Sequence, residues 1–171
     1  MRDKNLMDAV TKTKRNIIKY LYTNKNIINW LNNEDVDPET PDTAVGTCIF
    51  PFIKIPGIQE DAECYIGVKI DTRRDYTNPV YIDLDIVIAV LCADSILTVN
   101  GEKGIRTDLI AGEIATMLNH NNDFGFEMEL IETIEGSLSE SKYYFRNLQF
   151  HTKRFNNIKC GVPEEYEMEE D

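Results

Sequence analysis

Residues near the start of the chain repeat at intervals of three and four positions, the spacing of one face of an α-helix. The segment from Leu6 to Tyr22 carries such a stripe: Leu6, Val10, Thr13, Ile17 and Leu21. After an interruption, Asn24 is a suitable N-cap for a second, short helical piece. That piece contains the apolar residues Ile27, Ile28, Trp30 and Leu31. The pattern therefore predicts two linked helices.

The next part of the chain carries the signals of a loop and then of an extended segment. Residues 32–42 are acidic and contain two prolines, which predicts an exposed loop. Residues 45–50 are apolar and β-branched, and Pro51 and Pro56 then flank the short run 52–55. Because proline cannot donate a hydrogen bond to a neighbouring strand, we expect an edge strand or an extended arm here.

Strict alternation of apolar and polar residues marks two strands in the middle of the chain. The alternating segments are residues 64–71 and 80–90, and the turn-forming run 73–79 lies between them. This order predicts an antiparallel hairpin. One face of the second strand begins with Asp83 and Asp85 and ends apolar, so we expect one end of the strand to be covered on both sides.

Residues 93–106 form a stretch of about fourteen residues that contains the strong turn signal Asn100-Gly101. Three apolar residues precede this turn: Ile96, Leu97 and Val99. The pattern predicts a small protruding β-arm with exposed apolar residues, of the kind that grips a neighbouring subunit.

A third helix and two further strands are predicted in the second half of the chain. The helix begins at Thr107 or Asp108 as the N-cap. Its expected buried stripe consists of Leu109, Ile110, Ala111, Ile114, Met117 and Leu118. Gly112 costs this helix about 1 kcal/mol relative to alanine, which suggests close packing on the sheet. Residues 124–135 and 143–152 alternate as strands, joined by a hairpin loop at 136–141.

The order of these elements predicts an α+β fold, in which helices gather on one face of a mainly antiparallel, twisted sheet. The chain of 171 residues is long enough for one core. We expect a single domain over residues 1–160, followed by an acidic, disordered tail at 161–171.

The composition is that of a soluble globular protein with a surplus of acid. There are 30 acidic and 18 basic residues, a formal net charge of −12. The last eight residues hold six carboxylates, so the rest of the chain carries a net charge of −6. Such a charge disfavours binding to nucleic acid, and no apolar run has the length of a membrane span. The basic residues of the first helix, Lys12, Lys14, Arg15 and Lys19, favour a solvated face over a phosphate-binding one.

The four cysteines stand at positions 48, 64, 92 and 160, mostly in apolar surroundings, and lack zinc-ligand spacing. Buried, reduced thiols are the favoured interpretation. A Cys48–Cys64 disulfide stays open as an alternative.

The best candidate for chemistry is the trio Asp71, Asp83 and Asp85. Carboxylates on one strand face can share a divalent metal, as in nucleases, with Lys69 or Arg73 as a basic helper. The opposite face of the strand is apolar, however, and two aspartates are what a half-solvated strand carries by default. We therefore favour a solvated face and expect no catalytic residue, metal or cofactor.

Neither histidine points to catalysis. His120 lies at the expected end of a helix, where a structural role is favoured. His151 has no acidic or serine partner in its local sequence. The sequence also lacks a nucleophile elbow, a P-loop, a dinucleotide fingerprint and a zinc-protease motif.

The order of features over residues 6–152 resembles the tail terminator (tail completion) proteins of long-tailed bacteriophages. The segments that carry the resemblance are the helical runs 17–21 and 27–31, the proline-flanked run 50–56, the strand end 87–90, the helix start 106–110 and the closing pair of strands. The resemblance is one of pattern and order.

The resemblance implies a twisted sheet with helices on one face and a structural role in the virion neck or tail. Six copies would form a ring that caps the tail tube and meets the head-closure or connector proteins, while DNA passes through the channel. The chain would be made in the host cytoplasm and would bind no membrane. A grip on the adjacent subunit is expected from Ile96, Leu97 and Val99 of the arm, together with Phe52 and Ile53. The alternatives are another neck or head-closure protein, the metal-dependent nuclease, and a monomer that binds a small molecule.

Overall fold

The computed structural model describes residues 6–37, 39–57, 62–75, 77–78, 80–124 and 126–155. The predicted acidic tail and Cys160 lie outside these ranges.

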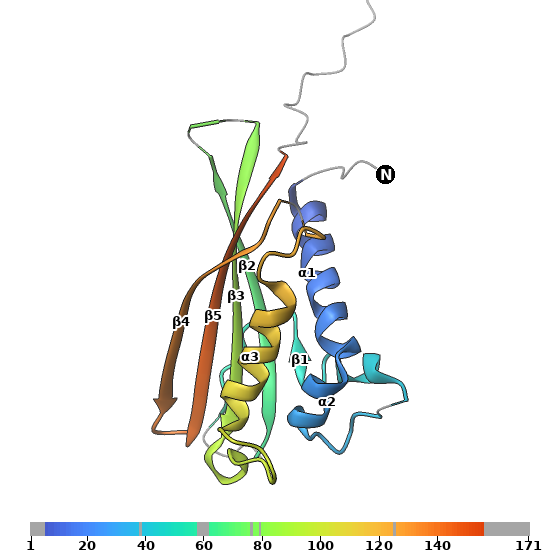
Figure 1. The fold of residues 1–171 in the computed structure, drawn as a ribbon, viewed down its shortest axis with the longest axis vertical. Helices are drawn as coiled ribbons and strands as arrows, with labels where there is room; N and C mark the ends of the chain where they lie inside the picture. Colours follow the sequence, from blue (N-terminus) through green and yellow to red (C-terminus); the bar gives the residue numbers. More distant parts are fainter. Residues whose placement is uncertain are drawn as a thin grey trace, which may run out of the picture.

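A five-stranded sheet forms one layer of the molecule and the helices form the other (Figure 1). Along the chain the elements are α1 (Leu6–Thr23), α2 (Lys25–Leu31), β1 (Ile49–Phe50), β2 (Cys64–Arg74), β3 (Tyr81–Ala93), α3 (Arg106–Leu118), β4 (Glu129–Leu138) and β5 (Tyr143–Phe155), with short 3₁₀ turns at Pro41–Ala44 and Asp94–Ile96. The strand order is β1-β2-β3-β5-β4. Only the β1–β2 pair among them is parallel. The predicted α+β fold class is confirmed.

The helices α1, α2 and α3 cover one face of the sheet. α1 packs on β1 and β2, α3 packs on β3, β4 and β5, and α2 contacts both of the other helices. The apolar residues of the even-numbered positions of β2 and β3 point into this layer, for example Ile66, Val68, Ile86 and Ile88. The hydrophobic core thus lies between sheet and helices.

The N-terminal helices agree closely with the prediction. Val10, Thr13, Ile17 and Leu21 are buried along α1. Thr13 is tolerated in this stripe because its hydroxyl accepts a hydrogen bond of 2.7 Å from Arg154 of β5. Asn24 caps α2 by accepting hydrogen bonds from the backbone N–H groups of residues 26 and 27.

The start of α3 and the role of its glycine differ from the prediction. The helix begins at Arg106, and its N-cap is Ile105, which provides no side-chain hydrogen bond. Thr107 is buried and Asp108 binds Arg146, so neither side chain caps the helix. Gly112 does not pack on the sheet either, since a Cβ placed on it would meet nothing within 4 Å. It lies on the solvent side of α3.

The predicted strand 124–135 is shifted along the chain in the structure. β4 begins only at Glu129 and runs to Leu138, which lies inside the predicted hairpin loop 136–141. Just before β4, Met128 bonds to the loop after α3, donating to the Asn121 carbonyl and accepting from the His120 N–H. Phe126 bonds to β5, donating to the Lys153 carbonyl and accepting from the Thr152 hydroxyl, but forms no strand there. Phe124 and Met128 are buried there, which explains their apolar character.

The segment 93–106 is not the protruding apolar arm that its sequence predicts. A short bridge between Thr98 and Ile105 does exist. Ile96 and Leu97, however, pack against the core, and Val99 is half-buried. The expectation of exposed apolar residues is therefore wrong here.

Of the two predicted alternatives, an edge strand or an extended arm, the structure forms an edge strand here. β1 is only two residues long and pairs with the outer side of β2. Beyond it, the backbone of Phe52 and Ile53 crosses over Gly67 of β2. A Cβ at Gly67 would come within 2.6 Å of the Phe52 carbonyl oxygen and 3.0 Å of the Ile53 Cα. Glycine is thus required for this close approach.

Candidate functional site

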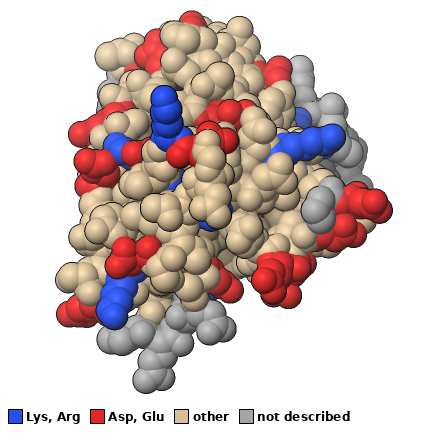
Figure 2. All heavy atoms as spheres, turned by 60° about the horizontal axis from the view of Figure 1, so that its bottom comes forward, with Lys and Arg blue, Asp and Glu red and all other residues tan. Residues whose placement is uncertain are grey.

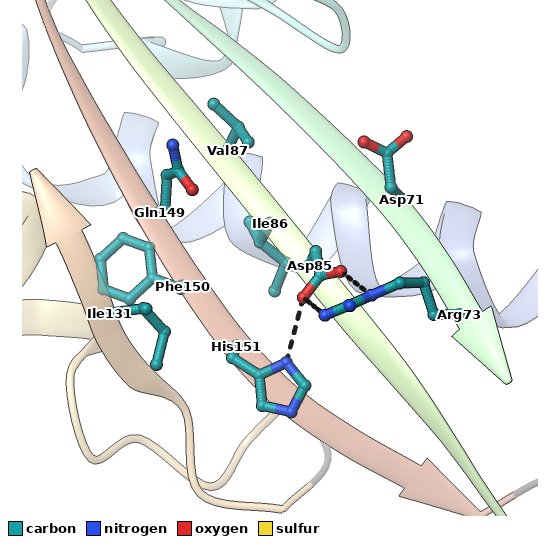
Figure 3. Close-up of a pocket in the computed structure, with 9 residues that line it drawn as sticks. All are labelled: Asp71, Arg73, Asp85, Ile86, Val87, Ile131, Gln149, Phe150 and His151. Atoms are coloured by element: carbon teal, nitrogen blue, oxygen red, sulfur yellow. Dashed lines mark hydrogen bonds and ion pairs between the residues drawn. The ribbon is translucent and has the colours of Figure 1, made fainter. Parts of the chain in front are cut away.

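The face of the sheet that points away from the helices carries a row of charged side chains, which we call the open face. Its register is set by the strand pairs: Asp71 of β2 lies opposite Asp85 of β3, and Asp85 lies opposite His151 of β5. Arg73 lies opposite Asp83 in the same way. The strand geometry therefore brings acidic and basic side chains from three strands together (Figure 3).

Asp85 stands at the centre of this row and lies between Arg73 and His151. Arg73 donates from Nε at 2.5 Å and from Nη2 at 3.0 Å to the two oxygens of Asp85. His151 lies on the other side, with its Nδ1 at 3.1 Å from Oδ1 (Figure 3). Burial alone would raise the pKa of Asp85, but these hydrogen bonds outweigh it and hold the pKa below its usual value. Asp85 is therefore a charged partner of Arg73.

A second group lies toward the end of β5. Lys153 contacts Asp75 at 2.8 Å and Asp83 at 3.7 Å. The hydrogen bond from Lys153, followed by those from Thr77, lowers the pKa of Asp75, and Asp75 in turn raises the pKa of Lys153. Oδ1 of Asp83 is buried without a hydrogen bond, with Nε2 of His151 at 3.5 Å.

The structure does not assemble the three aspartates into a metal centre. Asp71 pairs with Lys69 at 2.6 Å, while Asp85 is held by Arg73. Within the described part of the chain, no three His, Cys, Asp or Glu side chains are placed to hold a metal ion. The two basic residues expected as helpers thus act as ion-pair partners of the aspartates.

His151 is the residue of this row that sequence reasoning missed. Its acidic partners lie on β3, more than sixty residues earlier in the chain. The sequence indicated these partners only through the alternation that puts Asp83 and Asp85 on the same face of their strand. His120 fulfils the prediction of a helix-end role: it adopts a φ of 61° just after α3, and its ring pairs with Glu127.

The surface around Asp85 is hollowed, but the hollow is shallow. It opens along the sheet between the charged side chains and the apolar residues Val87 and Ile131. Small-molecule sites are usually enclosed and apolar. The open face is thus better suited to contact with another protein surface than to a small ligand.

The residues expected at a subunit interface divide into two groups. Phe52 is 54% exposed, whereas Ile53 is half-buried against the core, as are Ile96 and Leu97 of the 93–106 segment. The described residues expose other large apolar side chains instead. Ile131 and Ile134 lie on the edge strand β4, and Phe126 and Phe155 stack near Tyr81 at the other end of the open face. The exposure of Ile131 and Ile134 depends on which strand forms the edge, and no sequence pattern indicates that.

The cysteines of the described chain are buried thiols. Cys48, Cys64 and Cys92 carry no disulfide, and Cys64 lies opposite Cys92 in the strand register. Burial raises the pKa of Cys48 to about 12 and also raises that of Cys64. The Cys48–Cys64 bridge left open by the sequence is not formed.

Charge on the end of the molecule that carries α2 is mixed. Figure 2 shows red and blue side chains interspersed among uncharged residues, without a continuous basic surface on that face. Such a face offers no track for a nucleic-acid backbone. Among the described residues, no helix combines the length and apolarity needed to cross a membrane.

Taken together, the fold and site define an α+β protein with an ion-paired open sheet face. The chain belongs to the YomW family, a phage-related family, whose model matches residues 15–152. It is also similar to a chain in a solved structure described as "Virion of native gene transfer agent (GTA) particle". That similarity has a TM-score of 0.40 and 14% identity, and covers 78% of this chain and 92% of the other. None of the curated proteins matches the chain.

Proposed function

We propose that this protein is a structural component of a phage-type virion, the tail terminator. In this proposal, six copies form a ring that caps the tail tube and joins it to the head-closure or connector proteins. The protein is made in the host cytoplasm and then resides in the neck or tail of the particle.

The observation that carries the proposal is the fold. A twisted sheet with the described helices on one face is the architecture that the resemblance to tail terminators implies. The family match over residues 15–152 supports the same conclusion, because it covers nearly the whole stretch on which the resemblance rests and links the chain to phages.

The net charge of the protein supports a role in which DNA passes close to the protein without binding to it. A net acidic chain repels the phosphate backbone, so DNA passes through the ring without binding. The ion pairs of the open face support this role as well, because they use the basic side chains of Arg73 and Lys153 for internal contacts.

The proposal is tested by locating the protein and removing it. We expect purified particles to contain the chain, and antibody labelling in electron micrographs to place it where head and tail meet. Particles made without the protein should have tail tubes of uncontrolled length and unattached heads. Absence from purified particles would overturn the proposal. Tails of normal length beside open heads would instead identify a head-closure protein.

A further inference from the structure

A strand edge and a groove on opposite sides of the molecule carry opposite charge, and each has its own exposed apolar residue. β4 forms one edge of the sheet, and α1 lies over the opposite edge, beyond β2 (Figure 1). We infer that the β4 edge of one copy docks into a basic groove along α1 of the next copy. This inference rests on the proposed ring and names the surfaces that build it.

The β4 edge is acidic, with an apolar knob. Glu129 and Glu132 are exposed on this strand, and none of the described residues forms an ion pair with either of them. The register shift between Leu130 and Glu132 interrupts the ladder at Ile131, which is 62% exposed. Edge strands that face solvent usually carry charged or polar side chains. An isoleucine this exposed between two carboxylates therefore indicates a surface that contacts another protein.

The complementary groove lies between α1 and the segment after the 3₁₀ turn at Pro41–Ala44. It has a volume of about 510 Å³. Its lining includes Arg15, Ile18, Lys19, Tyr22, Val45 and Pro51. Arg15 and Lys19 are exposed, and neither has an ion-pair partner in the described ranges. Val45 is 43% exposed, so the groove offers an apolar site beside two unpaired cations.

Charge decides which surfaces can meet. Two β4 edges brought together would place Glu129 and Glu132 against like charges, and two α1 faces would do the same with Arg15 and Lys19. Like charges in close apposition are destabilising. The acidic edge therefore pairs with the basic groove, which is a contact between two different surfaces. Contacts of this head-to-tail kind generate closed rings when the rotation between copies closes.

The experiment uses charge reversal and native mass spectrometry of the full chain. The edge variant is Glu129→Lys with Glu132→Lys, and the groove variant is Arg15→Glu with Lys19→Glu. We expect the wild type to form rings and each variant alone to lose them. An equimolar mixture should regain rings of even subunit number with the two variants in equal proportion, because every contact is then complementary again.

Matched controls carry the same charge change outside both surfaces. Glu34→Lys with Asp35→Lys, and Lys25→Glu with Lys103→Glu, alter exposed residues and should leave the rings intact. Ile131→Ser is a second variant that leaves every charge in place, and it should also weaken ring formation. Regained rings in the mixture further show that both variants fold.

Each failure has a distinct meaning. Rings that persist in both charge-reversal variants would overturn the docking surfaces and leave the ring of the proposed function standing. A wild-type chain that stays monomeric at its highest soluble concentration would also overturn the docking contact. The place of the protein in the particle is decided independently, by its detection in purified virions.

Discussion

Arg106 Nε donates a hydrogen bond of 2.8 Å to the carbonyl oxygen of Ile96, ten residues earlier in the chain. The same guanidinium donates to the carbonyl of Trp30 at the end of α2. Arg106 is buried at the first position of α3, so one side chain ties together α2, α3 and the segment that follows β3. This tie explains why Ile96 and Leu97 lie against the core.

Replacing this arginine should destabilise the protein strongly. Arg106→Met keeps an apolar stem of similar length but leaves two carbonyl oxygens without their charged donor. We expect a loss of about 3 kcal/mol in the free energy of unfolding, measured with urea. Lys103→Met, at an exposed position of the same segment, should change it by less than about 0.5 kcal/mol. A loss below about 1 kcal/mol for Arg106→Met would contradict the role of this residue.

Two glycine-to-alanine substitutions should have opposite effects. Gly67→Ala forces the backbone of Phe52 and Ile53 away from the sheet, with an expected cost of about 2 kcal/mol. Gly112→Ala meets no atom within 4 Å and improves helix propensity, so it should stabilise the protein by about 1 kcal/mol. Urea unfolding of both variants measures this contrast. Equal effects of the same sign would show that the 52–53 segment does not rest on the sheet.

Asp75 should make the free energy of unfolding depend on pH in the acid range. Hydrogen bonds from Lys153 and Thr77 lower its pKa in the folded state below that in the unfolded chain. Its stabilising contribution is therefore complete above the unfolded value of about 4 and disappears as the pH falls through the folded value. We expect Asp75→Asn to flatten the decline of stability below about pH 4, measured by urea midpoints. Lys153→Met should do the same, and an unchanged pH curve in both variants would refute the ion pair.

The buried thiols should be unreactive until the protein unfolds. In a Cys160→Ser background, the remaining cysteines are the three buried ones. Burial raises the pKa of Cys48 to about 12 and also raises that of Cys64, so little of either thiol is thiolate at pH 8. The hydrogen bond with Cys64 lowers the pKa of Cys92, but Cys92 is fully buried and is therefore shielded from the reagent by the fold. We expect the folded protein to be alkylated at least about 100-fold more slowly than the protein unfolded in guanidinium. Mass spectrometry measures the extent of alkylation over time. Rapid modification of the native chain would show that the strand ends around Cys64 open readily.

Local pattern was enough to predict the helices and the central hairpin. The spacing of Val10, Ile17 and Leu21 predicts α1, and the side chain of Asn24 does cap α2 as expected. The alternation in β2 and β3 likewise predicts their antiparallel pairing. These features depend on contacts between residues close in the chain, and the periodicity of a sequence records such contacts directly.

Assignments that depended on a distant partner were less accurate. The exposure of Ile96 and Leu97 could not be judged without Arg106, and the start of β4 could not be placed without the loop after α3. Phe124, Phe126 and Met128 alternate as residues of a strand would, yet Phe124 and Met128 are buried in the segment before β4. A buried position favours an apolar residue whether it lies in a strand, a helix or a turn, so the sequence pattern does not tell these elements apart.

By itself, then, the sequence determined the fold class, three helices, the central hairpin and the acidic balance of the chain. The tertiary structure alone decided that β4 forms the edge and that His151 of β5 meets Asp85 of the neighbouring strand β3. It also placed the acidic edge and the basic α1 face on opposite sides of the molecule. Strand order arises from packing between segments far apart in the chain, and such packing has no period that a single sequence displays.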